Sequence, residues 1–283
     1  MRGMAEVSRE QISDLFGLVD RAMPGERLTP DELLAGCFDD AGTVLALGDG
    51  SGSVSAVTRM SGDSTVGWVK LLAVEPDARR HGHGRALLAA AESWAFDLGA
   101  TEIQLAGSAP FYFWPGVPGD ALEMLCLAEA GRYDAIGGEL NMSIPTTYRA
   151  PVPEGMVIHR VVDDPDVDSV VEFTKARWPW WLPELHRGIE QGGCQIAIDD
   201  HDRAVLGFAC HSVNRAAWIG PMGTEPERRG RGVGNALLGA LCTDLMTANL
   251  RDAEISWVGP IRFYAKAGAR VSRMFRLYRK RKP

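Results

Sequence analysis

One motif occurs twice in this chain, in the same register and 150 residues apart. The first copy runs Val74-Glu-Pro-Asp-Ala-Arg-Arg-His-Gly-His-Gly-Arg-Ala-Leu-Leu88, and the second runs Thr224-Glu-Pro-Glu-Arg-Arg-Gly-Arg-Gly-Val-Gly-Asn-Ala-Leu-Leu238. When both copies are extended by two residues, 9 of 17 positions are identical. Self-similarity at a fixed offset indicates an internal duplication. Because 283 residues are enough for two domains that each bury a core, we predict two domains of the same fold.

The hydrophobic pattern predicts one order of elements in both halves: a strand, two helices, three strands, the motif, a helix, a strand, a helix and a final strand. Alternating apolar residues favour strands directly before each motif, at 67–74 and 216–223. Leucines at helical spacing follow each motif. This order predicts an α+β fold with a mixed, mostly antiparallel sheet flanked by helices. We expect domains at 1–147 and 156–283, joined by the linker 148–155.

Composition argues against several classes of protein. No apolar run approaches the ~20 residues that span a bilayer, and the N-terminus lacks the apolar core of a signal peptide, so we expect a cytoplasmic protein without a membrane partner. The five cysteines are scattered and never form a Cys-x-x-Cys pair, which argues against a disulfide framework and against a metal site. The net charge of -7 argues against a nucleic-acid partner and favours a cationic substrate, with the basic stretch 273–282 as a minor nucleic-acid alternative.

Both copies of the motif place glycines and cations directly before an apolar helix. Glycines leave backbone N–H groups unscreened, and the unpaired amides of a helix N-terminus favour a phosphate or pyrophosphate. The residues predicted to hold this anion are Arg79, Arg80, His81, Gly82, His83, Gly84 and Arg85 in the first copy and Arg229, Gly230, Arg231, Gly232, Val233, Gly234 and Asn235 in the second.

Two common phosphate-binding motifs do not fit this spacing. A P-loop requires Lys followed by Ser or Thr after its last glycine, and neither copy has that pair. The dinucleotide fingerprint requires a third glycine where these copies have Leu87 and Leu237. The spacing that both copies share is Arg-x-x-Gly-x-Gly.

This spacing resembles the signature of the GNAT family of acetyl-CoA-dependent N-acyltransferases, Gln/Arg-x-x-Gly-x-Gly/Ala at a strand-to-helix junction. The order of elements in each half is similar to the order in that family. The second half also carries Phe263-Tyr264-Ala-Lys-Ala-Gly268-Ala269, which resembles the family's late Phe-Tyr-x-x-x-Gly-Phe element. The resemblance covers nearly the whole chain, once per half, so the chain resembles a tandem member of this family.

The resemblance implies acetyl-CoA as the donor and direct attack by an amine. In the family a backbone amide of the strand before the motif polarises the thioester carbonyl, and a tyrosine often protonates the leaving thiolate. Tyr264 is at the position of that general acid. The matching strand residues are Leu72, Ala73 and Val74 in the first half and Met222, Gly223 and Thr224 in the second.

The two halves differ behind the motif. The first half has no clear counterpart of the compact 263–268 segment and carries the aromatic stretch 110–119 instead. Within that stretch, Tyr112 is either a general acid or one of four crowded aromatics that form a core or a pocket wall. We therefore expect the second half to be the better catalytic candidate. The first half either binds coenzyme A without strong turnover or acts on its own substrate.

The acceptor and the general base are less constrained by the sequence. His211, Glu254 and the acidic turn 199–202 are candidate bases, but an amine can also lose its proton through water, so none is assigned. The tryptophans of 178–181 either border the acceptor pocket or seal the two domains together.

The predicted function is the transfer of an acetyl group from acetyl-CoA to a primary amine of a small molecule. The alternative is an acyl-CoA-binding sensor or pseudoenzyme in which one or both sites perform no chemistry. We expect a monomer or a homodimer. The sequence does not name the acceptor, because variable loops build acceptor pockets.

Overall fold

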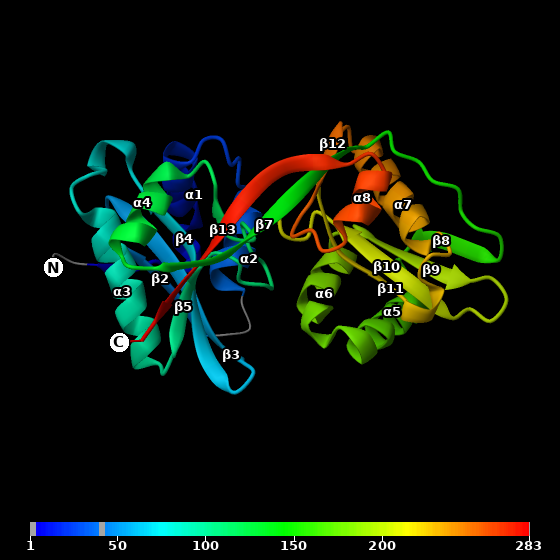
Figure 1. Ribbon diagram of the computed structural model, residues 1–283, viewed down its shortest axis with the longest axis horizontal. Helices are drawn as coiled ribbons and strands as arrows, with labels where there is room; N and C mark the ends of the chain where they lie inside the picture. Colours follow the sequence, from blue (N-terminus) through cyan, green and yellow to red (C-terminus); the bar gives the residue numbers. More distant parts are fainter. Residues whose placement is uncertain (1–3, 40–42, 283) are drawn as a thin grey trace. The chain divides into compact units, whose positions relative to one another are not determined.

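The computed structural model describes residues 4–39 and 43–282 and divides the chain into two compact units. Unit 1 comprises Met1–Glu139 and Met274–Pro283, and unit 2 comprises Leu140–Arg273. Each unit contains a mixed sheet flanked by helices, which confirms the predicted α+β fold (Figure 1). Within the described residues, no helix combines the length and the apolar character needed to cross a membrane.

Unit 1 contains the first copy of the motif, between β4 and α3. Its elements in chain order are β1 (Ala5–Glu6), α1 (Ile12–Ala22), α2 (Pro30–Phe38), β2 (Thr43–Gly48), β3 (Gly52–Ser61), β4 (Ser64–Val74), α3 (His83–Asp97), β5 (Glu102–Leu105), β6 (Val117–Pro118), α4 (Leu122–Ala130) and the start of β7 (Asp134–Pro145). Its strands are ordered β1-β2-β3-β4-β5-β13, where β13 (Arg270–Arg281) is the last strand of the chain. β4 and β5 run parallel.

Unit 2 contains the second copy, between β11 and α7. Its elements are β8 (Met156–Arg160), α5 (Asp164–Arg177), α6 (Leu182–Glu190), β9 (Cys194–Asp199), β10 (Val205–His211), β11 (Trp218–Thr224), α7 (Val233–Thr247), β12 (Asp252–Ile255) and α8 (Ile261–Lys266). Its strands are ordered β8-β9-β10-β11-β12-β7, and β11 and β12 run parallel. The two units therefore share one topology around the motif, as the repeat predicted.

Helices cover both faces of the sheet in unit 1. α3 and α4 pack on one face through a cluster that includes Leu87 and Ala128, and α1 and α2 pack on the other through a cluster that includes Leu15 and Leu33. In α3 the buried positions Leu87, Leu88, Ala91 and Ala95 recur at helical spacing, which is why this segment folds as a helix against the sheet.

A bulge in β4 changes the face that its side chains meet. The register with β3 shifts by one residue at Lys70. Before the bulge Val69 packs on the α3 side, and after it Leu71 packs on the side of α1 and α2. Because a bulge re-aims the strand, Leu72 and Val74 lie on the α3 side, next to the motif.

The last strand of the chain completes the sheet of unit 1. β13 pairs with β5 from Tyr278 opposite Leu105 to Arg281 opposite Glu102. Meanwhile β7 places 142–145 beside β12 in unit 2. These units differ from the expected domains, 1–147 and 156–283, because strand pairing groups Met274–Pro283 with the first part of the chain.

The basic C-terminal stretch belongs to this strand. Arg279 lies 3.6 Å from the carboxylate of Glu102, and Lys280 lies 2.7 Å from that of Glu92. Two of its cations are therefore paired within unit 1.

Replacing Phe275 by alanine is expected to destabilise unit 1. The Phe275 ring is 3% exposed and packs in the core beneath α1 and α2, so its truncation leaves a cavity that costs about 3–5 kcal/mol. Met274→Ala is the matched control, because Met274 is 69% exposed. Chemical denaturation should show the loss for Phe275→Ala alone. Equal stability of the two variants would contradict the placement of β13 in unit 1.

Candidate functional site

The sheet opens at the strand that precedes each motif. In unit 1 the last pair between β4 and β5 is Val69 with Leu105, and β4 continues for five residues beyond it. In unit 2 the last pair between β11 and β12 is Ile219 with Ile255, and β11 also continues for five residues. Each unit thus has a gap between two parting strands.

Strand alternation determines which amides face the gap in unit 1. The N–H of Glu75 donates to Ser51 on the β3 side, at 2.9 Å. Because N–H groups alternate along a strand, Ala73 points the same way, and the N–H groups of Leu72 and Val74 point into the gap.

Unit 2 follows the same rule. The N–H of Glu225 donates to Leu206 of β10 at 2.9 Å. Alternation then directs the amide of Gly223 toward β10 and the amides of Met222 and Thr224 into the gap. Four of the six predicted strand residues therefore offer an amide to a ligand there.

The two motif loops share one backbone conformation. Gly82 and Gly232, directly before α3 and α7, adopt left-handed φ angles of 94° and 87°. A residue with a Cβ is strained in this region, which explains the glycine at both positions. Neither glycine can cap its helix through a side chain, so the N–H groups of the first turn lack a side-chain cap. An anion is the ligand that such amides favour.

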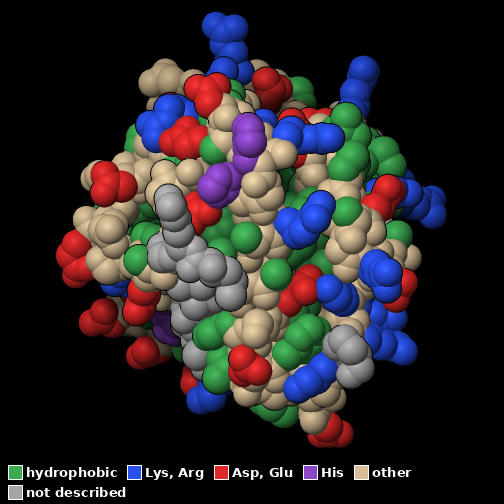
Figure 2. Space-filling view, turned by 90° about the vertical axis from the view of Figure 1, so that its left-hand side faces the viewer, with side chains coloured by type: hydrophobic (Ala, Val, Ile, Leu, Met, Phe, Trp, Pro, Cys, Tyr) green, Lys and Arg blue, Asp and Glu red, His purple; other side chains and the backbone are tan. Residues whose placement is uncertain are grey.

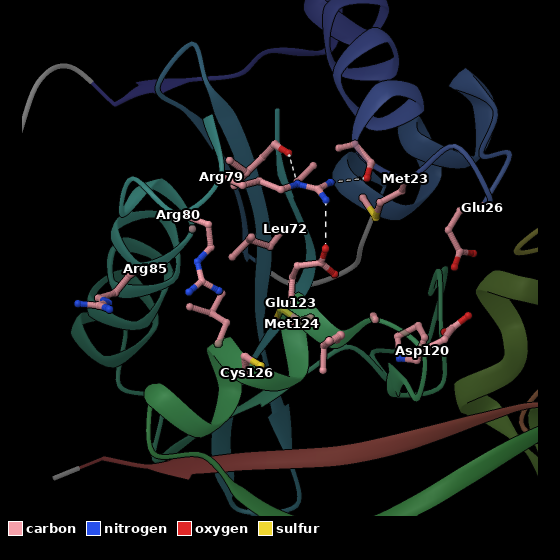
Figure 3. A pocket seen from close by; sticks show the side chains of 18 of the residues that line it. Met23, Glu26, Leu72, Arg79, Arg80, Arg85, Asp120, Glu123, Met124 and Cys126 are labelled. Carbon is pink, nitrogen blue, oxygen red and sulfur yellow. Dashed lines mark hydrogen bonds and ion pairs between the residues drawn. The ribbon is translucent and has the colours of Figure 1, made fainter. Parts of the chain in front are cut away.

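A cavity of about 920 Å³ adjoins the motif loop of unit 1 (Figure 3). Its walls are the end of β4, the loop, the segment after α1, Trp114 and α4. The predicted site residues that line it are Leu72, Ala73, Val74, Arg79, Arg80, Gly82, Gly84 and Arg85. This volume lies within the range of cofactor and ligand pockets.

Arg79, the first residue of the motif, connects three elements around this cavity. Its guanidinium donates to the carbonyl oxygens of Val74 at 3.3 Å and Ala22 at 2.6 Å, and to the carboxylate of Glu123 at 3.3 Å (Figure 3). These partners lie at the ends of β4 and α1 and on α4. Arg79 therefore holds the cavity walls together.

Arg80 and Arg85 supply the unpaired positive charge of the cavity. Both are exposed, both line it, and neither has a hydrogen-bond or ion-pair partner among the described residues. Figure 2 shows the face of the molecule that forms the left-hand side of Figure 1, where Lys and Arg side chains gather mainly on one side and many Asp and Glu side chains lie along the opposite edge. Positive charge on this face is thus localised, although the chain carries a net charge of -7.

The two histidines of the first motif are placed differently. His83 Nδ1 lies 2.6 Å from Asp49 Oδ2, which ties the loop to the turn between β2 and β3. Burial opposes the ionisation of Asp49, but His83 and the backbone amides of Ser51 and Gly52 together hold its pKa below the usual value. His81 is exposed, and the cavity lining does not include it.

The loop of unit 2 lies closer to its surroundings. A Cβ at Gly232 would lie 2.9 Å from the ring of Pro153, and one at Gly239 would lie 3.0 Å from the backbone nitrogen of Ala150. Part of the predicted linker 148–155 therefore packs along α7. In unit 1 a Cβ at Gly82 would meet nothing within 4 Å.

The other predicted residues of the second motif are mostly exposed. Val233 differs, because its side chain is 2% exposed and packs in the core, which leaves only its amide at the start of α7. Gly230 has a left-handed φ of 79°. The exposed side chains are those of Arg229, Arg231 and Asn235.

Tyr264 lies on α8, beside the start of α7. The ring of its neighbour Phe263 lies 3.2 Å from the Cβ position of Gly234. Tyr264 is 6% exposed and belongs to the same core cluster as Ile219, where β11 leaves β12. Burial raises the pKa of its phenol to about 12, so the group is protonated at neutral pH. Within the described part of the chain its hydroxyl forms no hydrogen bond, so it is available to a ligand.

Ala128 is the counterpart of Tyr264 in unit 1. After α8 the N–H of Ala269 donates to the carbonyl of Tyr264, and after α4 the N–H of Tyr133 donates to the carbonyl of Ala128, both at 3.0 Å and both one residue before the next strand. The helix predicted at this place in both halves is therefore α4 in unit 1 and α8 in unit 2. In unit 1 this helix supplies a methyl group where unit 2 has a phenol.

The aromatic stretch of unit 1 is mainly core. Phe113 is 2% exposed, and its ring lies 2.2 Å from the Cβ position of Gly36 on α2. Tyr112 is 8% exposed and is not part of the cavity lining, whereas Trp114 is. Of the two roles considered for Tyr112, this placement supports packing.

Trp178 and Met23 occupy equivalent places. Each follows the first helix of its unit and donates its N–H to the carbonyl four residues earlier, at 2.7 Å. Met23 lines the cavity of unit 1. In unit 2 the ring of Trp178 lies 2.3 Å from the Cβ position of Gly223. It packs at 5.1 Å from the ring of Trp181, tilted by 36°, whereas Trp180 is 62% exposed. Trp178 therefore forms a wall beside β11.

Glu254, His211 and Asp199, three of the candidate general bases, have neighbours in unit 2 that the structure identifies. Glu254 accepts a hydrogen bond from Asn141 at 2.6 Å. His211 Nε2 lies 3.7 Å from Asp244, and Asp199 accepts from an amide of its own turn at 3.0 Å. At 3.7 Å His211 Nε2 forms no hydrogen bond with Asp244, and no general base is assigned.

Each unit thus combines a gap in the sheet, a helix that begins at a left-handed glycine, and exposed arginines beside it. A family model described as the acetyltransferase (GNAT) family matches residues 12–112 and again residues 160–269, which together are more than half of the chain. The chain belongs to the GNAT family of acetyltransferases. It is a tandem member, since each match contains one copy of the motif. Members of this family use an acyl-CoA donor.

Individual relatives are more distant. Over 229 residues the chain is 27% identical to mycothiol acetyltransferase from Actinosynnema mirum, a match that covers 75% of this chain and 73% of the relative. Its fold is similar to the GCN5-related glucosamine N-acetyltransferase region of a fungal multi-domain GH3 beta-N-acetylglucosaminidase (TM-score 0.78, 18% identity, 98% of this chain), of which it spans only 38%. It is also similar to a tandem GNAT protein from the clavulanic acid biosynthesis pathway (TM-score 0.73, 17% identity, 99% of both chains). The two structural matches show the tandem fold alone.

Proposed function

We propose that this protein transfers an acetyl group from acetyl-CoA to a primary amine of a small molecule, with unit 2 as the main catalytic unit. The observation that carries the proposal is Tyr264, a buried and protonated phenol without a hydrogen-bond partner in the described part of the chain, in the core cluster that also contains Ile219 of the last β11–β12 pair. Acyl transfer needs a donor for the carbonyl oxygen and a proton for the leaving thiolate. The amides of Met222 and Thr224 supply the first, and Tyr264 supplies the second.

The loops fit the pyrophosphate of an acyl-CoA. The amides at the starts of α3 and α7 have no side-chain cap, and no atom lies within 4 Å of the Cβ position of Gly82. Arg80 and Arg85 flank that space in unit 1. When bound, acetyl-CoA supplies the thioester carbonyl that the amine attacks. A cytoplasmic location and a monomer or homodimer remain part of the prediction.

The test is thiol release from acetyl-CoA with a panel of small primary amines. We expect release above the amine-free rate with at least one amine, and the acetylated amine as product. If the intact protein binds no coenzyme A, or if no amine raises thiol release, the proposal is wrong.

The sensor alternative has a specific observation in its favour, which concerns unit 1 alone. This unit has the open cavity and the cationic loop, but Ala128 replaces the phenol. That combination favours acyl-CoA binding with little turnover. Titration should then give two coenzyme A sites per chain, while turnover follows Tyr264; a single site would contradict it.

A further inference from the structure

The cavity of unit 1 connects the two faces of the sheet. Leu72 and Leu127 line it and pack with the cluster on the side of α3 and α4. Met23, Ala73 and Trp114 also line it, but they pack with the cluster on the side of α1 and α2. The cavity therefore continues from one face to the other at the end of β4, beside the gap where β4 parts from β5.

The two ends of this cavity differ in chemistry. In Figure 3 Arg80 and Arg85 lie next to α3, and Met23 lies on the other side of Leu72. Because neither arginine has a partner among the described residues, both suit phosphate groups. The other end, which we call the apolar end, is formed by Met23, Ala73 and Trp114. Such a cavity fits a ligand that is anionic at one end and apolar at the other.

Three carboxylates also line the cavity, and each is accounted for without a ligand. Glu123 is paired with Arg79 at 3.3 Å, and Glu26 has an interaction partner within the protein. Asp120 is exposed, so water solvates it. Apolar side chains are therefore the groups that a ligand meets at the apolar end.

The walls of the apolar end combine a fixed ring with an adaptable side chain. The Trp114 side chain is 7% exposed, and its ring packs at 5.6 Å from that of Phe113, which is 2% exposed. Met23 is half-buried, and an unbranched methionine adjusts its shape to the group beside it. This combination suits a linear aliphatic chain.

Unit 2 fills the equivalent space with its own side chain. The 150-residue offset pairs Ala73 with Gly223, and the bonds after the first helices pair Met23 with Trp178. The ring of Trp178 lies where a Cβ at Gly223 would be, so this ring requires a glycine beneath it. Unit 1 keeps the Cβ of Ala73 and has the thinner side chain of Met23, and both residues line the open cavity. Unit 1 thus leaves to a ligand the space that the indole occupies in unit 2.

We propose that unit 1 binds an acyl-CoA whose acyl chain is longer than acetyl, with the chain in the apolar end. This inference rests on the proposed function, because it takes an acyl-CoA as the ligand of the motif loop. The amides of Leu72 and Val74 point into the gap, where they can hold the thioester carbonyl. With the pyrophosphate at Arg80 and Arg85, the chain beyond that carbonyl extends past the end of β4 into the apolar end.

The experiment is calorimetric titration of the full chain with acetyl-CoA and with hexanoyl-CoA, in the absence of an acceptor amine. Burial of each additional methylene raises the affinity by about fourfold. Hexanoyl-CoA is therefore expected to bind one site at least about tenfold more tightly than acetyl-CoA. Gly82→Asp, which places a carboxylate in the loop of unit 1, should remove that site and so assign it to unit 1.

The double variant Met23→Trp with Ala73→Gly gives unit 1 the pair of residues found in unit 2. Its indole should fill the apolar end, so that hexanoyl-CoA no longer binds unit 1 more tightly than acetyl-CoA does. Met60→Trp is the matched control, because Met60 is 66% exposed on β3 and does not line the cavity. This control should keep the wild-type preference for hexanoyl-CoA. Thermal unfolding of each variant shows that a lost preference is not a lost fold.

Equal affinities of unit 1 for acetyl-CoA and hexanoyl-CoA in the wild type would overturn the inference. An unchanged preference in the folded double variant would also overturn it. Hexylamine, titrated in the presence of saturating coenzyme A, tests whether the alkyl group belongs to an acceptor instead. Hexylamine binding that the double variant loses, without any preference for hexanoyl-CoA, would assign the apolar end to an acceptor and overturn the inference.

Thiol release from acetyl-CoA with the amine panel tests the proposed function separately. A preference for hexanoyl-CoA at unit 1 without any thiol release would preserve this inference and refute the transferase. Thiol release from acetyl-CoA without that preference would do the reverse.

Discussion

Gly82→Asp is expected to abolish coenzyme A binding at unit 1 and to reduce the stoichiometry of the full chain from two to one. Gly82 immediately precedes α3 at a φ of 94°, with open space where its Cβ would be. A carboxylate there would accept hydrogen bonds from the unpaired N–H groups of the helix and would repel the pyrophosphate that these groups are proposed to bind. We expect at least about a hundredfold loss of affinity, equivalent to about 2.7 kcal/mol, measured by calorimetric titration.

Gly82→Asn is the matched control for this prediction. Asparagine and aspartate have nearly the same shape and both tolerate a left-handed backbone, so the pair isolates the effect of the charge. Gly82→Asn should therefore lose less affinity than Gly82→Asp. If both variants retain two coenzyme A sites with the wild-type affinities, the loop is not the pyrophosphate site. The same substitutions at Gly232 are less informative, because Pro153 lies 2.9 Å from the Cβ position.

The features that the sequence predicts well are those encoded locally. The left-handed turn at Gly82 and Gly232 requires a residue without a Cβ, and the sequence shows a glycine at both positions. The helix after each motif depends on apolar spacing, and α3 buries the positions that this spacing indicates. Because both features recur at one offset, the tandem α+β fold could be predicted before any coordinates were known.

Features that depend on distant pairing could not be predicted. The pairing of β13 with β5 joins positions more than 170 residues apart, such as Tyr278 and Leu105. The sequence of neither strand indicates which strand it pairs with. The counterpart of Tyr264 could not be predicted for a related reason. The segment between the motif and this helix is longer in the first half, so the 150-residue offset no longer aligns the two halves, and a shared bond after each helix identifies Ala128 instead.

The roles of individual charges also required the structure. Arg79 is the first residue of the Arg-x-x-Gly-x-Gly motif, and the sequence predicts that it binds the anion. In the structure its guanidinium instead donates hydrogen bonds to Val74, Ala22 and Glu123. Glu26 and Asp120 belong to no motif, and only the folded chain brings both to one cavity. A motif thus identified the loop, while the surrounding elements determine which of its side chains are available.

Tyr264→Phe is expected to lower kcat by about 10²–10⁴-fold and to leave coenzyme A binding unchanged. The substitution removes only the hydroxyl, and general acid catalysis typically contributes a factor of about 10²–10⁴ to the rate. The Phe263–Tyr264 packing against α7 is retained, because the ring remains. Tyr148→Phe is the matched control: Tyr148 packs against the same core cluster of unit 2, and we place it in neither the loop nor the gap. It should keep wild-type kcat.

The pH profile distinguishes an acid catalyst from a packing residue at this position. Burial raises the pKa of Tyr264 from 10.0 to about 12, so the phenol keeps its proton as the pH rises from about 8 to 10. Over that range the wild-type rate should increase as the acceptor amine becomes neutral, with no decline from ionisation of the tyrosine. Any activity left in Tyr264→Phe is assigned to unit 1, and Gly82→Asp should then remove it. If Tyr264→Phe retains wild-type kcat across this range, Tyr264 is a packing residue, and the catalytic acid must be sought elsewhere in the gap.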